Sequence, residues 1–188
     1  MRNQLTVTNV AASSTEFRIF GPALLPKDMP WPKDMNGQAM LLFVSFPLHE
    51  ISTYKDVSEN LICNVFITYD PINHEHLYGG SLDESCDSAL AGAAFIVSNS
   101  EEAKIQKRRV VDAPRKLEQE LVKGEEPYWL QDEIIIKDMS CMFQLSAVSI
   151  ARNYPQLDSV FGDEEYYFFL PKKSDLNPLV GRIVVQMT

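Results

Sequence analysis

One stretch limits the fold more than any other: residues 20–46, which read FGPALLPKDMPWPKDMNGQAMLLFVSF. It places four prolines ahead of a strongly apolar end. Each proline fixes the backbone angle φ and removes an amide donor, so residues 21–34 cannot form a helix or a central strand. We expect an extended loop there. Trp31, held between Pro30 and Pro32, is expected to pack over an edge of the core.

Strands are predicted on both sides of the next polar segment. After the turn sequence NGQ, the run AMLLFVSFPL at residues 39–48 is almost continuously apolar, which indicates a strand buried on both faces. A second strand is expected in residues 61–70, LICNVFITYD. One face of it carries Leu61, Cys63, Val65, Ile67 and Tyr69.

The rest of the chain also favours strands over helices. Further strands are expected within residues 3–10, 16–21, 93–99, 133–148, 163–171 and 182–187, with two strands meeting near 137–140. Residues 103–112 fit a strand or a helix. The best helix candidate is 113–127, with Pro114 early and Gly124 as a stop. Because strands outnumber helices and do not alternate with them, we predict an α+β fold of mostly antiparallel sheets with few helices.

Two segments of the chain resemble each other. MLLFVSF and NVFITYD are echoed by CMFQLSA and YYFFLPK about a hundred residues later. Aligning Ser45 with Ser146 leaves 20 residues to Val65 in the first copy and 21 to Tyr167 in the second. We expect one domain over residues 1–188, with related units at roughly 39–70 and 139–170. Chance similarity between apolar strands is the alternative.

Charge and cysteine usage bear on the class of protein. The chain carries 17 basic and 26 acidic residues, a net charge of −9. Residues 104–116 hold six of the bases and one acid, so the remainder carries 11 bases against 25 acids, or −14. Such a surface repels nucleic acid and anionic membranes and attracts basic partners. An acidic surface that only maintains solubility is the alternative.

The cysteines and the apolar runs predict a cytoplasmic protein. Cys63, Cys86 and Cys141 are widely spaced and form no CxxC pair, which fits a reducing compartment. The N-terminal residues lack the apolar region of a signal peptide, and the longest apolar run is too short to cross a bilayer. We therefore expect no membrane contact.

The order of motifs resembles the YwqG-like family of bacterial proteins, whose function is largely unknown. That order is GPALLP, WPKDMNGQAMLLFVSFPLHEI and NVFITYD, followed by MFQLS, FGDEEYYFFL and DL. The resemblance covers most of residues 17–188 and is loose over 75–135. The matching residues are Gly21, Leu25, Pro26, Trp31, Pro32, Gly37, Phe43, Phe66, Tyr69, Gln144, Gly162, Asp163 and Phe168. It implies that the proline-rich segment is a structural strap that leads into the central strand.

The chain departs from the family pattern at three positions. Phe20 stands where glycine is usual, Ala23 where proline is common, and Ser45 where glutamine is common. If that glutamine serves a polar site, this chain has lost or altered it.

Members that resemble this family occur near polymorphic-toxin genes. Together with the acidic charge, the resemblance implies an immunity protein that neutralises a basic toxin or effector by direct binding. Such a protein needs no catalytic residue, metal or cofactor, and we assign none. The alternatives are an enzyme of unrecognised chemistry and an adaptor that binds a small ligand or peptide between the two units. The sequence leaves the oligomeric state open.

Two loops carry side chains suited to chemistry. In NHEH, residues 73–76, His74 and His76 would share one face of a strand and bind Zn²⁺, but no third ligand is evident and a solvated turn is more typical. In SLDESCDS, residues 81–88, Cys86 lies between Ser85 and Asp87, which suggests a nucleophile. A nucleophile needs a base within reach and an oxyanion donor, and sequence proximity shows neither.

A third cluster is Asp163 with Glu164 and Glu165. Paired carboxylates act as acid and base when their environments separate their pKa values. Neighbours in a strand point to opposite faces, so a polar turn feeding a buried strand is the favoured interpretation. The enzyme alternative would draw on His74, His76, Cys86 and Asp163.

The most acidic aromatic stretch is EQELVKGEEPYWLQDE, residues 118–133. It is expected to pair with the basic residues 104–116 of the same domain; the alternative is that the basic patch recognises an acidic protein. An aromatic anchor ringed by carboxylates also suits recognition of a basic protein, with ordinary core packing of the tryptophan as the alternative. The predicted partner-binding residues are Glu125, Glu126, Trp129, Asp132 and Glu133.

Overall fold

The structure is a computed structural model. It describes residues 6–9, 17–21, 23–26, 28–34, 36–51, 54–70, 75–76, 93–99, 103–106, 115–118, 127, 129–155, 164–172 and 181–187. The strands are β1 (Thr6–Asn9), β2 (Arg18–Ile19), β3 (Ala23–Pro26), β4 (Leu41–Pro47), β5 (Leu61–Ile67), β6 (Tyr69–Asp70), β7 (Glu75–His76), β8 (Ala93–Asn99), β9 (Ala103–Gln106), β10 (Arg115–Glu118), β11 (Met139–Ser146), β12 (Glu164–Pro171) and β13 (Arg182–Met187). The helical segments are the 3-10 turn η1 (Leu48–Glu50) and the helix α1 (Ala147–Asn153).

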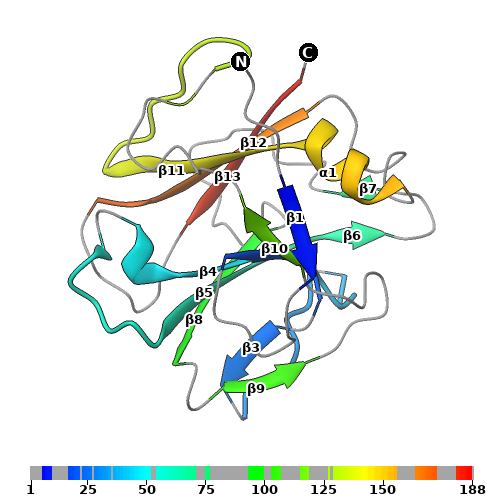
Figure 1. The fold of residues 1–188 in the computed structure, drawn as a ribbon, viewed down its shortest axis with the longest axis vertical. Coiled ribbons are helices and arrows are strands. Elements are labelled where there is room, and N and C mark those ends of the chain that lie inside the picture. Colours follow the sequence, from blue (N-terminus) through cyan, green and yellow to red (C-terminus); the bar gives the residue numbers. More distant parts are fainter. Residues whose placement is uncertain are drawn as a thin grey trace.

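Two antiparallel sheets form the body of the protein. The first sheet has the strand order β1-β10-β2-β4-β5-β8, and the second has the order β11-β12-β13. The ribbons β3-β9 and β6-β7 add two short pairs. In Figure 1 the second sheet lies above the first, and β3-β9 lies below it. The fold is therefore α+β with mostly antiparallel sheets and few helices, as the sequence predicted.

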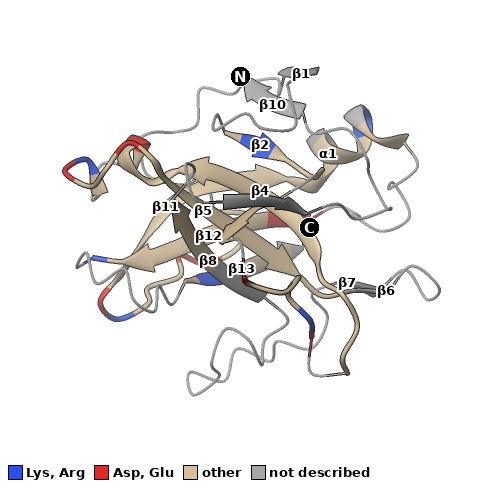
Figure 2. Cartoon of the chain, turned by 90° about the horizontal axis from the view of Figure 1, so that it is seen from below, with Lys and Arg blue, Asp and Glu red and all other residues tan. Residues whose placement is uncertain are grey.

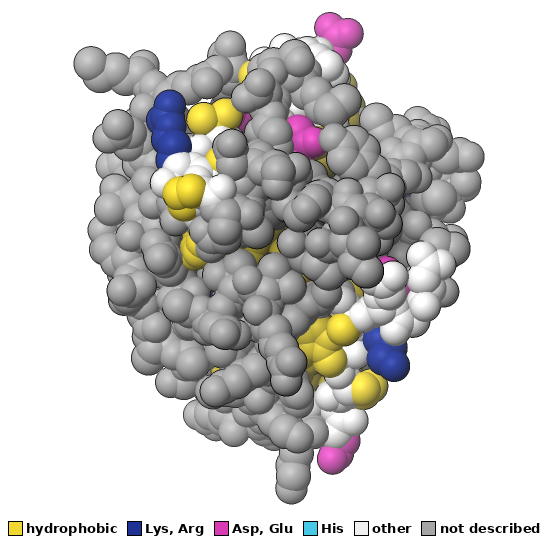
Figure 3. Space-filling model, turned by 90° about the vertical axis from the view of Figure 1, so that its right-hand side faces the viewer, with side chains coloured by type: hydrophobic (Ala, Val, Ile, Leu, Met, Phe, Trp, Pro, Cys, Tyr) yellow, Lys and Arg dark blue, Asp and Glu magenta, His cyan; other side chains and the backbone are white. Residues whose placement is uncertain are grey.

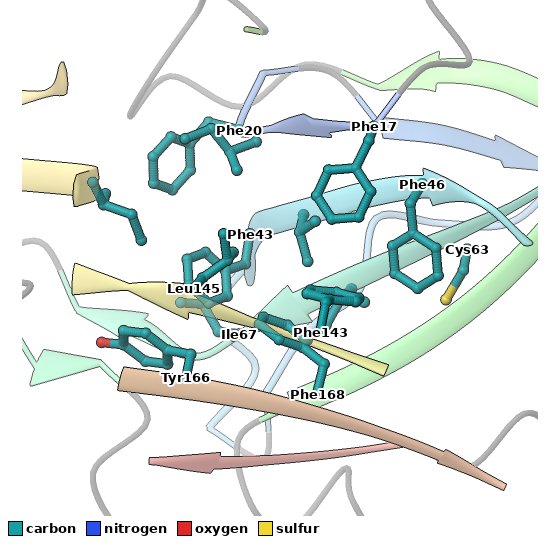
Figure 4. Close-up of a cluster of buried hydrophobic side chains, with 14 of the residues drawn as sticks. Phe17, Phe20, Phe43, Phe46, Cys63, Ile67, Phe143, Leu145, Tyr166 and Phe168 are labelled. Atoms are coloured by element: carbon teal, nitrogen blue, oxygen red, sulfur yellow. The ribbon is translucent and has the colours of Figure 1, made fainter. Parts of the chain in front are cut away.

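The main core lies between the two sheets and is rich in aromatic rings. Phe143 of β11 stacks on Phe168 of β12 with ring centroids 4.2 Å apart. Phe43 of β4 meets Tyr166 edge to face at 5.1 Å (Figure 4). Each buried ring removes a large apolar area from water, and edge-to-face and offset contacts add to that stabilisation. The aromatic contacts thus bind the sheets to each other.

The first sheet is buried on its other face as well. All seven residues of β4 are buried, as the apolar run predicted. Leu42 and Phe66 face away from the main core and pack with Leu25 of β3. Trp31 covers this second cluster: its ring meets Phe66 at 5.3 Å, and its Nε1–H donates to the carbonyl of Met40 at 2.7 Å. The predicted packing of Trp31 over a core edge is confirmed.

A short turn fixes the end of the proline-rich segment. The Asp34 carboxylate accepts hydrogen bonds from the amides of Asn36 and Gln38, both at 2.9 Å. Gly37 has φ of +76°, which glycine adopts without strain. The predicted NGQ turn is present. The prediction of loop throughout residues 21–34 is wrong for Ala23–Pro26, which forms β3. Among the described strands β3 pairs with β9, and Pro26 ends the strand, where a missing donor is tolerated.

The two similar segments fold in the same order. β4 has a bulge between Leu42 and Val44, continues into η1 and pairs with β5; β11 has a bulge between Cys141 and Phe143, continues into α1 and pairs with β12. Matching the bulges places Ser45 with Gln144, two residues before the Ser146 chosen by sequence alignment. The same match makes the two helical segments start at equivalent positions.

Three predicted elements differ from the structure. The helix predicted over 113–127 is wrong at Arg115–Glu118, which forms β10 between β1 and β2; residues 119–126 lie outside the described ones. Pairing on both sides overrides the local helix preference there. Residues 133–148 contain one strand, β11, and not two strands that meet near 137–140. The last two residues of this range, 147 and 148, begin the helix α1.

A buried polar network ties β3 to the first sheet. The Ser45 hydroxyl donates to Asn64 Oδ1 at 3.2 Å, and Asn64 Nδ2 donates to the carbonyl of Leu24 at 2.8 Å. Ser98 of β8 donates to the same carbonyl, also at 2.8 Å. Because these groups are shielded from water, each lost partner carries a desolvation cost.

Asn64→Ala is expected to lower the free energy of unfolding by about 2–3 kcal/mol, because it leaves the Ser45 hydroxyl without its acceptor and opens a small void. Urea denaturation measures this loss. The matched control is Asn36→Ala, an exposed asparagine whose loss is expected to stay within about 0.5 kcal/mol. Equal losses for the two variants would show that the network does not stabilise the fold.

Tyr54 joins the end of β12 to the segment after η1 and predicts a pH dependence. Its hydroxyl donates to the carbonyl of Pro171 at 2.7 Å, and burial, assisted by nearby Cys63, raises its pKa from 10.0 to about 12. The folded state favours the neutral phenol, so this stabilisation is complete below pH 10 and is lost as the pH rises towards about 12.

Denaturation at a series of alkaline pH values tests this expectation. Between about pH 10 and about pH 12, wild type should lose stability more steeply than Tyr54→Phe, which has no phenol to ionise. The comparison uses the slope alone, because the variant also loses the bond to Pro171. Parallel slopes would mean that Tyr54 does not ionise differently in the folded and unfolded states.

Candidate partner-binding site

The outer face of the second sheet is covered by a loop. Alternate residues of β12 point away from the first sheet, so Tyr167 and Phe169 lie on the outer face with Val184 of β13. These side chains are nevertheless buried, because Trp129, Ile134 and Ile136 pack against them. We call residues 129–138 the cover segment; in Figure 1 it leads directly into β11.

Trp129 packs on the outer face of β12. Its ring stacks on Tyr167 with centroids 4.7 Å apart and an interplanar angle of 27°, and lies 6.3 Å from Phe169. The side chain is partly buried. One face of the ring is therefore used in the protein's own packing, which is the alternative named for this residue. Its contact with a partner stays a prediction.

A single side chain holds the start of the cover segment. Gln186 of β13 is 3% exposed, and its Oε1 accepts hydrogen bonds from the amides of Leu130 at 2.9 Å and Gln131 at 3.1 Å. Its Nε2 donates to the carbonyl of Asp132 at 2.8 Å. The Tyr167 hydroxyl accepts a further bond from the Leu130 amide at 3.1 Å. Three consecutive backbone units are thus fixed by side chains of the sheet below.

The fixed segment presents charged side chains to solvent. Asp132 and Glu133 are exposed, directly after the residues bound by Gln186. The structure therefore brings together three of the five predicted partner-binding residues, with Trp129 as the inward member. Glu125 and Glu126 lie outside the described residues. Figure 3 shows the side of the molecule that lies at the right in Figure 1. On this side, the hydrophobic side chains of the described residues form small separate areas.

Most of the other candidate residues fall outside the described chain. His74, Cys86 and Asp163 are not among the described residues, and His76 lies in the short strand β7. No group of three or more His, Cys, Asp or Glu side chains able to hold a metal ion occurs within the described ranges. Across the same ranges, no helix is long and apolar enough to span a membrane.

Several ionisable groups are buried inside the sheets. Glu164 and Glu165 lie in β12 and are 4% and 8% exposed; Glu164 accepts a hydrogen bond from the Tyr166 hydroxyl. Arg18 of β2, the strand drawn partly blue in Figure 2, is buried, and burial lowers its pKa to about 10. Burial also raises the pKa of the Cys141 thiol to about 11, which disfavours the reactive thiolate at neutral pH.

Gln186 was not found by sequence reasoning, because the pattern of its strand does not mark it. In the strand RIVVQM, the two-residue period places position 186 on the same side as Val184, which faces the buried cluster. A glutamine on a buried face must satisfy its amide with hydrogen bonds. In the sequence, however, that side reads Arg182, Val184, Gln186, which is typical of a solvated face, so the burial of Gln186 and its role as a clamp follow only from the packing of the cover segment.

Comparison with known proteins adds no relative. No protein-family model matches this chain, and no curated protein matches it significantly.

Gln186→Leu is expected to release the cover segment, since it removes three hydrogen bonds and replaces the amide with an apolar side chain of similar size. The free energy of unfolding should fall by about 1–3 kcal/mol. Acrylamide quenching of Trp129 fluorescence should rise, measured in a Trp31→Phe background because the chain has two tryptophans. Gln38→Leu, at an exposed glutamine, is the matched control. Unchanged quenching in Gln186→Leu would show that the clamp does not order the segment.

Proposed function

We propose that this protein is a non-enzymatic binding protein that neutralises a basic bacterial toxin or effector by direct contact. The observation that carries the proposal is the cover segment. It exposes Asp132, whose backbone is fixed by Gln186, and Glu133 directly after it. A neutralising protein needs a stable complementary surface and requires no chemistry of its own.

The charge of the chain supports a basic partner. The net charge is −9, and it reaches −14 outside residues 104–116. A negative surface of this kind speeds the encounter with a positively charged protein and disfavours acidic competitors. Rapid association suits a protein that must block an enzyme before it acts.

The fixed backbone supports binding for a second reason. Association is opposed by the entropy lost when mobile loops and side chains become ordered at an interface. Because Gln186 and Tyr167 already hold residues 130–132, that part of the cost is met during folding. The surface is therefore prepared for a partner before the encounter.

The resemblance to the YwqG-like family, including its occurrence near toxin genes, favours the same function. The separated cysteines favour a cytoplasmic location for the encounter. Three observations thus support the proposal: the negative net charge, the ordered cover segment and the motif order.

A pull-down from the native organism tests the function. The tagged protein is incubated with lysate at low salt, and bound proteins are identified by mass spectrometry. The expected result is one basic enzyme in near-stoichiometric amount, whose toxicity in a test cell disappears when this protein is co-expressed. If no basic protein is enriched, or if co-expression fails to protect the cell, the proposed function is wrong.

Charge reversal at the predicted partner-binding acids is expected to slow association with that enzyme. Asp132→Lys, and separately Glu125→Lys with Glu126→Lys, should reduce the association rate constant by roughly tenfold at low salt and flatten its dependence on salt. Stopped-flow mixing measures both quantities. Asp56→Lys is the matched control, since Asp56 is exposed and lies outside the cover segment. Equal effects for Asp56→Lys would indicate that only net charge matters.

A further inference from the structure

The cover segment exposes a large apolar side chain. Ile135 is 83% exposed, whereas its neighbours Ile134 and Ile136 are partly buried against the outer face of the second sheet. Burial alternates from Glu133 to Lys137, with the odd-numbered residues exposed. A period of two is that of an extended chain. One side of the segment is thus anchored, and the other presents Glu133, Ile135 and Lys137.

The backbone of this segment is open to pairing. Within the described part of the chain, no hydrogen bond is found to the backbone of Glu133, Ile134 or Ile135. An extended, isoleucine-rich segment with unpaired amides and carbonyls is a template for another strand. Its position is fixed at both ends: Gln186 holds residues 130–132, and the amide of Met139 donates to the carbonyl of Ile136 at 3.2 Å.

The exposed charges determine which strand fits. The exposed row reads Glu133, Ile135, Lys137, so it is complementary to itself when reversed. In an antiparallel pair with Ile135 opposite Ile135, each Glu133 lies opposite the other copy's Lys137. A parallel pair would instead place glutamate beside glutamate and lysine beside lysine. Opposite charges across a strand pair stabilise it, and like charges destabilise it.

Two further acids lie beside this row. Asp132 and Asp138 would come opposite each other if the pairing continued in both directions. The chain turns at Asp138, which has φ of 59° and whose carbonyl accepts a hydrogen bond from the amide of Lys172 at 2.8 Å. This turn takes Asp138 back towards its own sheet, and the long side chain of Lys137 can still reach across. The pairing is therefore limited to residues 133–137.

We propose that residues 133–137 of two copies of this chain pair antiparallel about a twofold axis at Ile135, which gives a weak, reversible homodimer. The contact is isologous, as twofold dimers require, because each copy uses the same residues. A basic partner peptide fits this row less well, since it would face Lys137. The inference is independent of the proposed function, because its only partner is the chain itself.

Sedimentation velocity with the full chain over a wide concentration series tests the dimer. Wild type should shift from the monomer mass of 21.3 kDa towards twice that mass as concentration rises. Ile135→Asp should remain a monomer at every concentration, and its high exposure means that the fold should be unaffected, which circular dichroism checks. A wild type that stays monomeric throughout, or an Ile135→Asp variant that dimerises normally, overturns the proposal.

Charge swaps test the register. Glu133→Lys alone and Lys137→Glu alone each turn two attractive pairs into two repulsive ones and should raise the dimer dissociation constant by roughly tenfold or more. The double variant Glu133→Lys/Lys137→Glu should recover the wild-type constant. So should an equimolar mixture of the two single variants, since each then supplies the charge that the other lacks. Failure of both recoveries would exclude antiparallel pairing at Ile135.

Discussion

The strand β12 must be buried on both faces, and the rest of the structure depends on this constraint. Tyr166 and Phe168 point to the first sheet, and Tyr167 and Phe169 point the opposite way. Aromatic rings on alternate residues cannot all be buried by one neighbouring layer. The first sheet covers one side through its own phenylalanines, and the cover segment closes the other. A three-layer arrangement follows from the composition of one strand.

A loop that covers a sheet must be held in place by other contacts, because its backbone is not hydrogen-bonded to a neighbouring strand. Gln186 supplies this fixing with one side chain, bonded to three successive backbone units. Side chains on the inward side of the segment join the apolar cluster, and those on the outward side are left to solvent. The acidic surface proposed to meet a toxin and the open segment proposed to pair with a second copy both arise from this arrangement. Asp132 belongs to the first role alone, so the two roles can be separated by substitution.

Sequence patterns predicted much of the sheet structure and less of the candidate site. Apolar runs placed β4, β5, β8, β12 and β13, and the prolines around Trp31 predicted its packing. β10 was missed because its residues favour a helix locally and become a strand only between two partners. The acids of the site were visible in the sequence. The inward turn of Trp129 and the exposure of Ile135, however, depend on which of the five apolar residues of the cover segment reach the sheet. That choice is made by tertiary packing, which no local pattern reports.

Amide hydrogen exchange on the cover segment tests the central claim most directly. The amides of Leu130 and Gln131, bonded to Gln186 and Tyr167, should exchange slowly. The amides of Glu133 and Ile135 point to one edge of this extended segment, and that of Ile134 points to the other. All three should exchange rapidly in dilute protein, and those on the edge that pairs should become slower at high concentration. Rapid exchange at Leu130 and Gln131 would show that the segment is not fixed to the sheet. The proposed binding surface at Asp132 and Glu133 and the proposed pairing of residues 133–137 would then both lose their structural basis.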